Sequence, residues 1–179
     1  MKRVLLQFCL ILTCMRRIIL IAHNVRSCHN IGSLLRTAEG LGVEKVYLTG
    51  YSPYPTETHD ERLPHLAQKI NKQIHKTALD AETLQDWHHE PDIFGVMTSL
   101  KASGFTIVGI EQHALSLALP DYQPPNKIAL VVGNEINGIE PKVAAHCDKL
   151  VEIPMFGKKE SFNVAQAAAI ALYHTTFAR

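Results

Sequence analysis

Short apolar runs alternate with amphipathic stretches along most of the chain. The runs are rich in β-branched residues and bounded by turn-forming residues, which predicts buried strands at 17–23, 45–49, 105–111, 128–132 and 150–153. Helical spacing of apolar residues between these runs predicts helices near 31–41, 66–74, 91–102, 140–146 and 164–175. Strands that alternate with helices are typical of the α/β class, so we expect a largely parallel sheet flanked by helices.

Two of the predicted helices carry end signals in their sequence. Asn30 is a good N-cap for the first helix, with Gly40 or Gly42 as its C-terminal stop, and Ser161 or Asn163 would cap the last helix. The boundaries of both helices are therefore predicted from residue chemistry as well as from periodicity.

The remaining stretches are polar and rich in turn-forming residues. A long irregular loop is predicted at 50–64, which holds three prolines, and a polar connection at 112–126. His88 and His89 are neighbours, so on a helix they would point to different faces. Tyr51 and Tyr54 in the long loop could either stack on nucleic-acid bases or pack within the loop.

Composition is that of an ordinary globular protein. The 179 residues suit one domain with a sizeable core, and the formal net charge of +1 neither supports nor excludes a nucleic-acid partner. The four cysteines form no CxxC pair and fit free thiols in a reducing, cytoplasmic compartment. The ten histidines show no metal-ligand spacing, so no metal site is expected.

The N-terminus holds an apolar run, 4–12, behind two basic residues. The run is shorter than a membrane-spanning helix requires, and no small-residue cleavage site follows it. An export signal is one interpretation. We favour the other, in which residues 1–14 are an N-terminal extension or a misassigned start, Met15 is the true start, and 15–179 form a single domain.

Several familiar functional motifs are missing from the sequence. It contains no G-x-x-x-x-G-K-[ST] phosphate loop, no G-x-G-x-x-G after a strand and no G-x-S-x-G elbow. These absences argue against an ordinary nucleotide hydrolase, a Rossmann dehydrogenase and a serine hydrolase.

Three polar clusters remain, and each has a plain structural interpretation beside a functional one. In 30–38, Arg36 is either a surface arginine or a guanidinium that forks onto a phosphate or carboxylate. In 132–140, two glycines and two asparagines form either a simple turn or a loop that approaches a ligand. In 153–165, a glycine turn and Ser-Phe-Asn either cap a helix or expose backbone N–H groups to a ligand.

Together the clusters resemble the three motifs of the SPOUT superfamily, and within it the TrmH (SpoU) family of RNA ribose 2′-O-methyltransferases. The signatures N-x-G-x-x-x-R-T-A, V-V-G-N-E-x-x-G and I-P-M-x-G-x-x-x-S-x-N-V-A are all intact. The resemblance runs from about Arg17 to the C-terminus.

The resemblance implies a deep trefoil knot at the C-terminal end, which binds S-adenosylmethionine, and a homodimer whose protomers share each site. It makes Arg36 the catalytic arginine, with Asn30, Glu135, Ser161 and Asn163 arranging the site. Whether Arg36 acts as a base or stabilises the phosphate and alkoxide stays open; guanidinium groups in general hold their protons in proteins, which favours the second role. The implied cofactor-binding residues are Leu130, Val132, Gly133, Asn134, Ile153, Met155, Ser161, Phe162 and Asn163.

The implied substrate is tRNA or rRNA, with no membrane and no metal involved. Basic residues would line the RNA path: Arg26, Arg36, Lys69, Lys72, Lys76, Lys158 and Lys159. Two alternatives are a catalytically inactive SPOUT-fold protein that binds RNA or cofactor, and a nucleotide-binding α/β enzyme of another reaction class.

Overall fold

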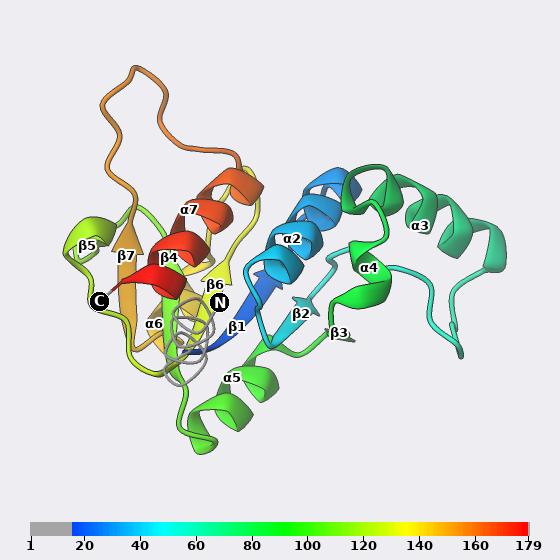
Figure 1. The fold of residues 1–179 in the computed structure, drawn as a ribbon, viewed down its shortest axis with the longest axis horizontal. Helices are drawn as coiled ribbons and strands as arrows, with labels where there is room; N and C mark the ends of the chain where they lie inside the picture. The colour runs from blue at the N-terminus through cyan, green and yellow to red at the C-terminus, as the bar shows by residue number, and fades with distance from the viewer. Residues whose placement is uncertain (1–15, 179) are drawn as a thin grey trace, which may run out of the picture.

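A seven-stranded sheet lies at the centre of residues 16–178, which the computed structural model describes (Figure 1). All strand pairs are parallel, in the order β3-β2-β1-β6-β4-β7-β5. The strands are β1 (Arg17–His23), β2 (Lys45–Thr49), β3 (Trp87–Glu90), β4 (Thr106–Ile110), β5 (Leu117–Ala118), β6 (Lys127–Val132) and β7 (Lys149–Glu152).

Helices cover both faces of this sheet. On one face α2 packs against α3, α4 and α7, and on the other lie α5 and α6. Their bounds are α2 (Cys28–Gly40), α3 (Pro64–Ala78), α4 (Ala81–Leu84), α5 (Ile93–Ala102), α6 (Pro141–His146) and α7 (Val164–Phe177), with a 3₁₀ turn, η1, at Leu119–Asp121. The predicted α/β class, a parallel sheet flanked by helices, is confirmed.

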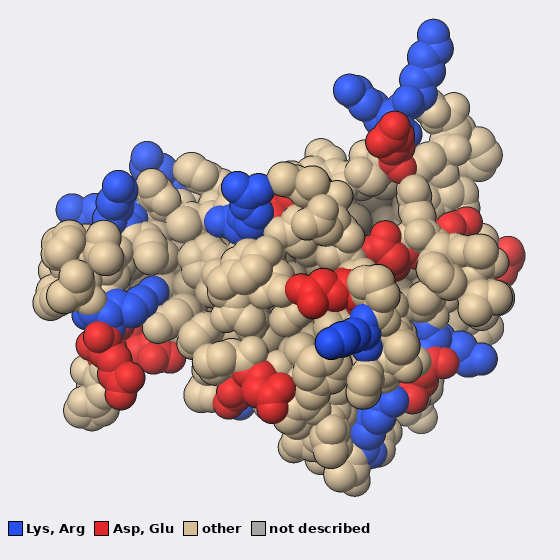
Figure 2. Space-filling view, turned by 180° about the vertical axis from the view of Figure 1, so that it is seen from behind, with Lys and Arg blue, Asp and Glu red and all other residues tan. Residues whose placement is uncertain are grey.

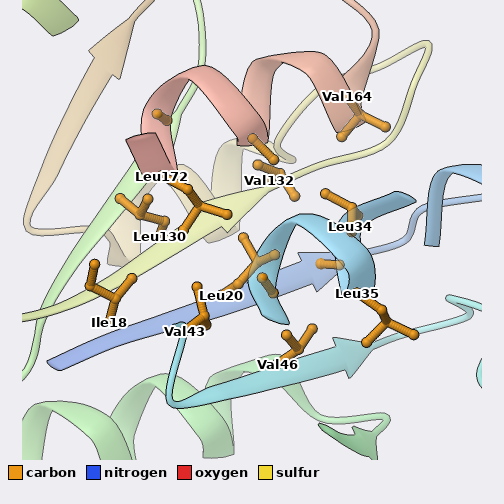
Figure 3. Close-up of a cluster of buried hydrophobic side chains, with 14 of the residues drawn as sticks. Ile18, Leu20, Leu34, Leu35, Val43, Val46, Leu130, Val132, Val164 and Leu172 are labelled. Carbon is orange, nitrogen blue, oxygen red and sulfur yellow. The ribbon is translucent and has the colours of Figure 1, made fainter. Parts of the chain in front are cut away.

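Strand β1 shows why the apolar runs are continuous rather than alternating. Its side chains point to the two faces in turn, so that Leu20 packs in the core under α2 and α7 (Figure 3), while Ile21 packs in the core under α5 and α6. Both side chains are completely buried. A strand covered on both faces has no solvent side on which polar residues would be favoured.

The five predicted strands are all present, but four elements were not predicted. The edge strand β3 has the sequence Trp-His-His-Glu, so His88 and His89 lie on a strand and not on a helix. Strand β5 has only two residues and, with η1, lies inside the predicted polar connection. The four-residue helix α4 is equally short. Short edge elements contain too few residues for a periodic pattern to stand out.

Helix α2 begins earlier than predicted, because Ser27 and not Asn30 is its N-cap. The Ser27 hydroxyl accepts a hydrogen bond from the Asn30 backbone N–H at 3.3 Å. Asn30 therefore lies in the first turn, and its side chain is available for other contacts. At α7, Asn163 is the cap, since its side-chain oxygen accepts from Ala165 N–H at 2.9 Å.

The prediction about residues 1–14 lies outside the described residues. Within the described residues, no helix is long and apolar enough to cross a membrane.

Candidate functional site

A pocket of about 240 Å³ opens where three neighbouring strands end. Its walls are the segments that follow β4 (110–112), β6 (132–138) and β7 (152–153), closed by residues 161–167 before and at the start of α7. The first two of these strands are adjacent in the sheet to each other, and β7 borders β4. This is the edge at which open α/β sheets bind ligands.

Most of the predicted cofactor-binding residues line this pocket: Val132, Gly133, Asn134, Ile153, Ser161 and Phe162. Leu130 does not, because its side chain is 1% exposed and packs in the core two residues before β6 ends. Met155 lines a neighbouring, more open hollow beside residues 112–116. Asn163 is directed elsewhere, toward Asn30.

Glu135 joins the turn after β6 to the loop after β1. Its Oε2 accepts the Arg26 backbone N–H at 2.9 Å, and its Oε1 accepts the Ser27 N–H at 3.0 Å and Asn30 Nδ2 at 2.9 Å. Burial alone would raise the pKa of Glu135, but the hydrogen bonds from Arg26, Asn30 and Ser27 outweigh it and hold the pKa below its ordinary value. Glu135 is therefore an ionised acceptor at neutral pH.

The same hydrogen-bond chain continues into the start of α7. Asn163 Nδ2 donates to Asn30 Oδ1 at 3.1 Å, while Asn30 Nδ2 donates to Glu135. Residues from the first, second and third sequence clusters thus meet at the mouth of the pocket. Of the five predicted catalytic residues, these three are bonded together and Ser161 lines the pocket beside them.

Arg36 stands apart from this group. It is exposed on α2, makes no hydrogen bond or ion pair with any described residue, and does not line the pocket of its own chain. Six residues along an α-helix turn a side chain by about 600°, which leaves Arg36 about 120° around the helix from Asn30. The helix that directs Asn30 at the pocket therefore directs Arg36 away from it.

Two acidic pocket residues escaped the sequence analysis, Glu111 after β4 and Glu152 at the end of β7. Glu111 Oε2 accepts the Ile139 N–H at 2.6 Å and fixes the far end of the turn after β6. A Cβ on Gly138 would lie 2.2 Å from that oxygen, and its φ of +64° also requires glycine. Both glutamates could have been found as polar residues that end buried strands at the pocket edge.

The predicted RNA-binding residues lie on several exposed surfaces. Lys69, Lys72 and Lys76 follow one another at helical spacing on α3, and Lys158 and Lys159 lie on the loop 154–163. None of these five has an ion pair with a described residue. Figure 2 shows Lys and Arg side chains over α3 and on the projecting loop, at opposite ends of that face.

The two tyrosines of loop 50–64 have different surroundings. The Tyr54 ring stacks on the His89 ring with centroids 3.9 Å apart, and the Arg62 guanidinium lies 3.5 Å from the centroid of the Tyr54 ring. Tyr51 is 61% exposed, and its hydroxyl accepts from Asn134 Nδ2 at 2.8 Å. Packing within the loop therefore describes Tyr54, while Tyr51 adjoins the pocket residues.

One group of potential metal ligands occurs in the described residues: His75, Asp80 and Glu82, where α3 meets α4. His75 Nδ1 lies 2.6 Å from Glu82 Oε1, and this contact raises the pKa of His75. None of the three lines the pocket, and the His–Glu pair gives the cluster a structural role in joining two helices.

Comparison with known proteins identifies the family. The sequence model of the SpoU rRNA methylase family matches residues 17–173, nearly the whole described chain. This chain belongs to the SpoU rRNA methylase family. The match contains all three polar clusters, which meet at the pocket.

Curated relatives of this SpoU chain are named as RNA methyltransferases. A 23S rRNA (guanosine-2′-O-)-methyltransferase of Neisseria meningitidis is 30% identical over 88% of this chain and 57% of its own length. A tRNA (guanosine(18)-2′-O)-methyltransferase of Aquifex aeolicus is 28% identical over 87% of this chain and 67% of its own length. The chain thus covers between about half and two thirds of the length of these relatives.

Solved structures share the SpoU fold. The TrmH/SpoU tRNA-modifying enzyme of Aquifex aeolicus superposes with a TM-score of 0.68 at 25% identity, covering 91% of this chain and 77% of that one. An AdoMet-bound rRNA methyltransferase of Sinorhizobium meliloti gives 0.75 at 20% identity, covering 90% and 56%. At these identities the second likeness establishes the fold alone.

Proposed function

We propose that this chain is an S-adenosylmethionine-dependent RNA methyltransferase that transfers a methyl group to a ribose 2′-hydroxyl of tRNA or rRNA. The observation that carries the proposal is the hydrogen-bonded group Asn30–Glu135–Asn163 at the mouth of the pocket, in a chain of the SpoU family. Relatives named for 2′-O-methylation of tRNA and of 23S rRNA support the substrate class.

The pocket suits the proposed cofactor better than a phosphorylated nucleotide. Its lining residues include three glutamates, Glu111, Glu135 and Glu152, and no lysine or arginine. Such a lining repels phosphate groups and favours a cationic sulfonium and ammonium. Apolar side chains of Val132, Ile153 and Phe162 offer a surface for an adenine ring. This chemistry weighs against the nucleotide-binding enzyme of another reaction class.

The chain's own residues would mainly position the reactants. When bound, S-adenosylmethionine supplies an electrophilic methyl group on its sulfonium. Arg36 binds an RNA phosphate through its forked guanidinium and stabilises negative charge on the 2′-oxygen as the hydroxyl proton passes to solvent water. Glu135, with both oxygens occupied by hydrogen bonds, holds the loop after β1 in place instead of taking that proton. Positioning of this kind can lower a barrier by about 7–11 kcal/mol.

The site is proposed to be shared by two copies of the chain. Arg36 is exposed and directed away from its own pocket, as expected of a residue that serves a partner. Helix α7 carries an exposed apolar stripe of Ile170, Tyr173 and Phe177, which offers a surface for a second copy. We also propose that the C-terminal segment around 153–163 forms the family's trefoil knot.

Further parts of the proposal concern the whole chain. Residues 15–179 form a single methyltransferase domain, and the basic residues on α3 and on loop 154–163 guide RNA to the pocket. Cys28 and Cys147 are free thiols, in keeping with a reducing, cytoplasmic compartment.

The test is transfer of tritiated methyl groups from S-adenosylmethionine to undermethylated tRNA and rRNA, followed by mapping of 2′-O-methyl positions. The expected result is label at a defined ribose, lost in Arg36→Ala and in a dimer-breaking Tyr173→Glu variant. Binding of S-adenosylmethionine without transfer to any RNA would favour the alternative, a catalytically inactive SPOUT-fold protein.

A further inference from the structure

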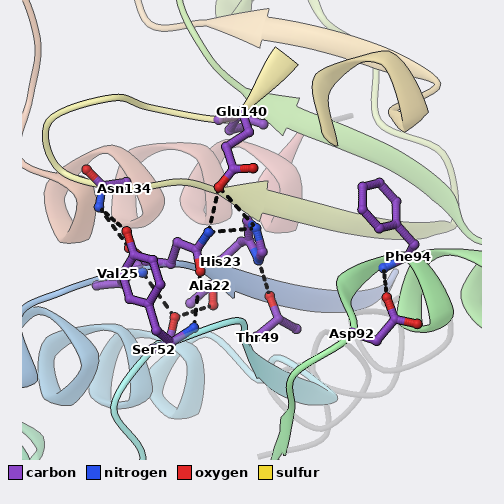
Figure 4. Close-up of polar contacts among 12 residues, drawn as sticks. Ala22, His23, Val25, Thr49, Ser52, Asp92, Phe94, Asn134 and Glu140 are labelled. Atoms are coloured by element: carbon purple, nitrogen blue, oxygen red, sulfur yellow. Dashed lines mark hydrogen bonds and ion pairs between the residues drawn. The ribbon is translucent and has the colours of Figure 1, made fainter. Parts of the chain in front are cut away.

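Figure 4 shows polar contacts that join His23, Asn134 and Glu140, and the hydrogen bonds of Asn24 link these three residues. Asn24 directly follows β1, is 8% exposed and has a left-handed backbone with φ +55°. Its backbone N–H donates to Thr49 O at 3.1 Å, and its backbone oxygen accepts from Asn134 Nδ2 at 3.0 Å. One residue therefore ties together the ends of β1, β2 and β6.

The Asn24 carboxamide has a defined orientation. Its Oδ1 accepts the Tyr51 backbone N–H at 3.1 Å, so Nδ2 must face the other way, where it donates to Glu140 Oε1 at 2.7 Å and lies 3.0 Å from His23 Nε2. An amide nitrogen can donate hydrogen bonds but cannot accept them, so His23 Nε2 is the acceptor in this contact. His23 is consequently the neutral tautomer whose Nδ1–H donates to Thr49 Oγ1 at 2.9 Å.

Little space is left around this side chain. A Cβ on Gly50 would lie 2.0 Å from Asn24 Oδ1, and Gly50 has a φ of +65°. Loop 50–52 is held from the other side as well, because Ser52 Oγ accepts Val25 N–H at 3.0 Å and donates to Ala22 O at 2.9 Å. The position of Asn24 is thus set by its neighbours on all sides.

The Asn24 contacts adjoin the Glu135 contacts both in the loop after β1 and in the turn after β6. Asn24 is bonded to Asn134, while Arg26 and Ser27, two and three residues further along, are bonded to Glu135. The loop after β1 and the turn after β6 are therefore held at two successive points, the inner one through Asn24 and the outer one at the pocket.

We propose that Asn24 is a positioning residue for methyl transfer: its carboxamide, donating toward Glu140 and His23, sets the loop that presents Arg26, Ser27 and Asn30 to Glu135. The inference rests on the proposed function. What matters is the donor at Nδ2, since a carboxylate of the same shape would face Glu140 and the His23 lone pair with oxygen.

The test reverses donor and acceptor. Asn24→Asp should lower kcat by about 10²-fold, the loss that small misplacements cause, while the dissociation constant for S-adenosylmethionine changes by less than about twofold. In Asn24→Asp with Glu140→Gln, the new amide donates to the new carboxylate. His23 can take the tautomer that donates from Nε2 while the Thr49 hydroxyl donates to Nδ1, so most of kcat should return. The matched control is Asn126→Asp, the same change at an exposed asparagine far along the chain.

Amide hydrogen exchange gives a second measurement that needs no activity. The Arg26 and Ser27 amides, which donate to Glu135, should exchange faster in Asn24→Asp and slow again in the double variant. Unchanged kcat and unchanged exchange in a folded Asn24→Asp would overturn the inference. So would a double variant that regains thermal stability but neither kcat nor protection. A wild-type chain that methylates no RNA would refute the proposed function instead, and the exchange data would still decide the role of Asn24.

Discussion

Arg36 and Arg62 carry the same side chain and use it in opposite ways. Arg62 is 18% exposed, and its donors are taken up by Asp60 and by the carbonyl oxygens of Tyr54 and Pro55. Arg36 is exposed and has no partner among the described residues. The first arginine organises loop 50–64, and the second has all five N–H donors free for a ligand.

The contacts of Arg62 and those of Glu135 differ in how far apart the bonded residues lie in the sequence. Arg62 contacts residues two to eight positions away, so its network can form within one loop. Glu135 accepts from residues 105 to 109 positions away, and its contacts exist only once distant segments meet. The local network around Arg62 stabilises its own loop. The long-range network around Glu135 instead joins segments that are distant in the sequence at the pocket.

The largest effect is expected at Arg36. Arg36→Ala should lower methyl-transfer kcat by about 10²–10³-fold, as loss of a group that stabilises developing charge does, with no change in thermal stability. Arg36→Lys keeps the charge but cannot make a forked contact, so it should remain strongly impaired. Steady-state kinetics on the methylated RNA measures both, and near-normal rates for Arg36→Lys would exclude bidentate positioning.

Arg62→Ala should show the reverse pattern. It removes hydrogen bonds of a charged donor and leaves Asp60 and two carbonyl oxygens without it, at a cost of about 2–3 kcal/mol in the free energy of unfolding. Urea denaturation measures this loss, and kcat below the unfolding transition should stay within about threefold. A folded Arg62→Ala variant of full stability but low kcat would show that the two arginines do not divide their roles this way.

Glu135→Gln tests the long-range network itself. The amide keeps one acceptor but places an NH₂ group against backbone N–H or Asn30 donors, so the loop after β1 should loosen. We expect kcat to fall by up to about 10²-fold, because the loop that carries Asn30 is misplaced. The matched control is Glu152→Gln, on the same pocket but with no hydrogen bond to that loop; equal losses in both would point to pocket charge instead.

Acid titration should measure how much the Asp60–Arg62 ion pair contributes to stability. The side-chain hydrogen bond from Arg62 holds the pKa of Asp60 well below its ordinary value of 3.8. Since the folded pKa is depressed, the stabilisation is present above about pH 4 and is lost as the pH falls below it. Between about pH 5 and pH 3 the unfolding free energy of wild type should fall more steeply than that of Asp60→Asn. Parallel curves would show that the pair does not contribute.

The smallest effect is expected at the lysines of loop 154–163. Lys158→Ala with Lys159→Ala should reduce the slope of log affinity against log salt by up to about 1.4 on single-stranded RNA, for two lost phosphate contacts. Fluorescence anisotropy at several salt concentrations measures the slope. An unchanged slope would remove this loop from the RNA path, and Lys101→Ala, at an ion-paired lysine on α5, is the control.

Sequence patterns predicted the buried elements well and the polar contacts less well. Strand β1 is apolar on both faces, and this pattern fits only a strand that is buried on both sides of the sheet. Asn30 illustrates the limit: as a residue type it suits an N-cap, but Ser27 takes that place and leaves the Asn30 side chain to Glu135. Which of two good caps is used depends on a partner about a hundred residues away.

The lining of the pocket was predicted only in part. Gly133 and Phe162 were found through the motif resemblance, and both line the pocket. Glu111 was missed because its strand carries no motif, and Asn24 because its role depends on contacts with Tyr51 and Glu140 that only the fold creates. Motifs identify residues that recur in a pattern, whereas packing decides which other residues accompany them.

The position of β6 has a consequence for synthesis of the chain. β1 pairs with β2 soon after both are made, but its other edge waits for β6, which begins about 110 residues later at Lys127. At the usual rates of translation that edge stays open for roughly 5–20 s. An apolar strand with an open edge is a template for intermolecular pairing. The nascent chain should therefore depend most on chaperone protection between emergence of β2 and emergence of β6.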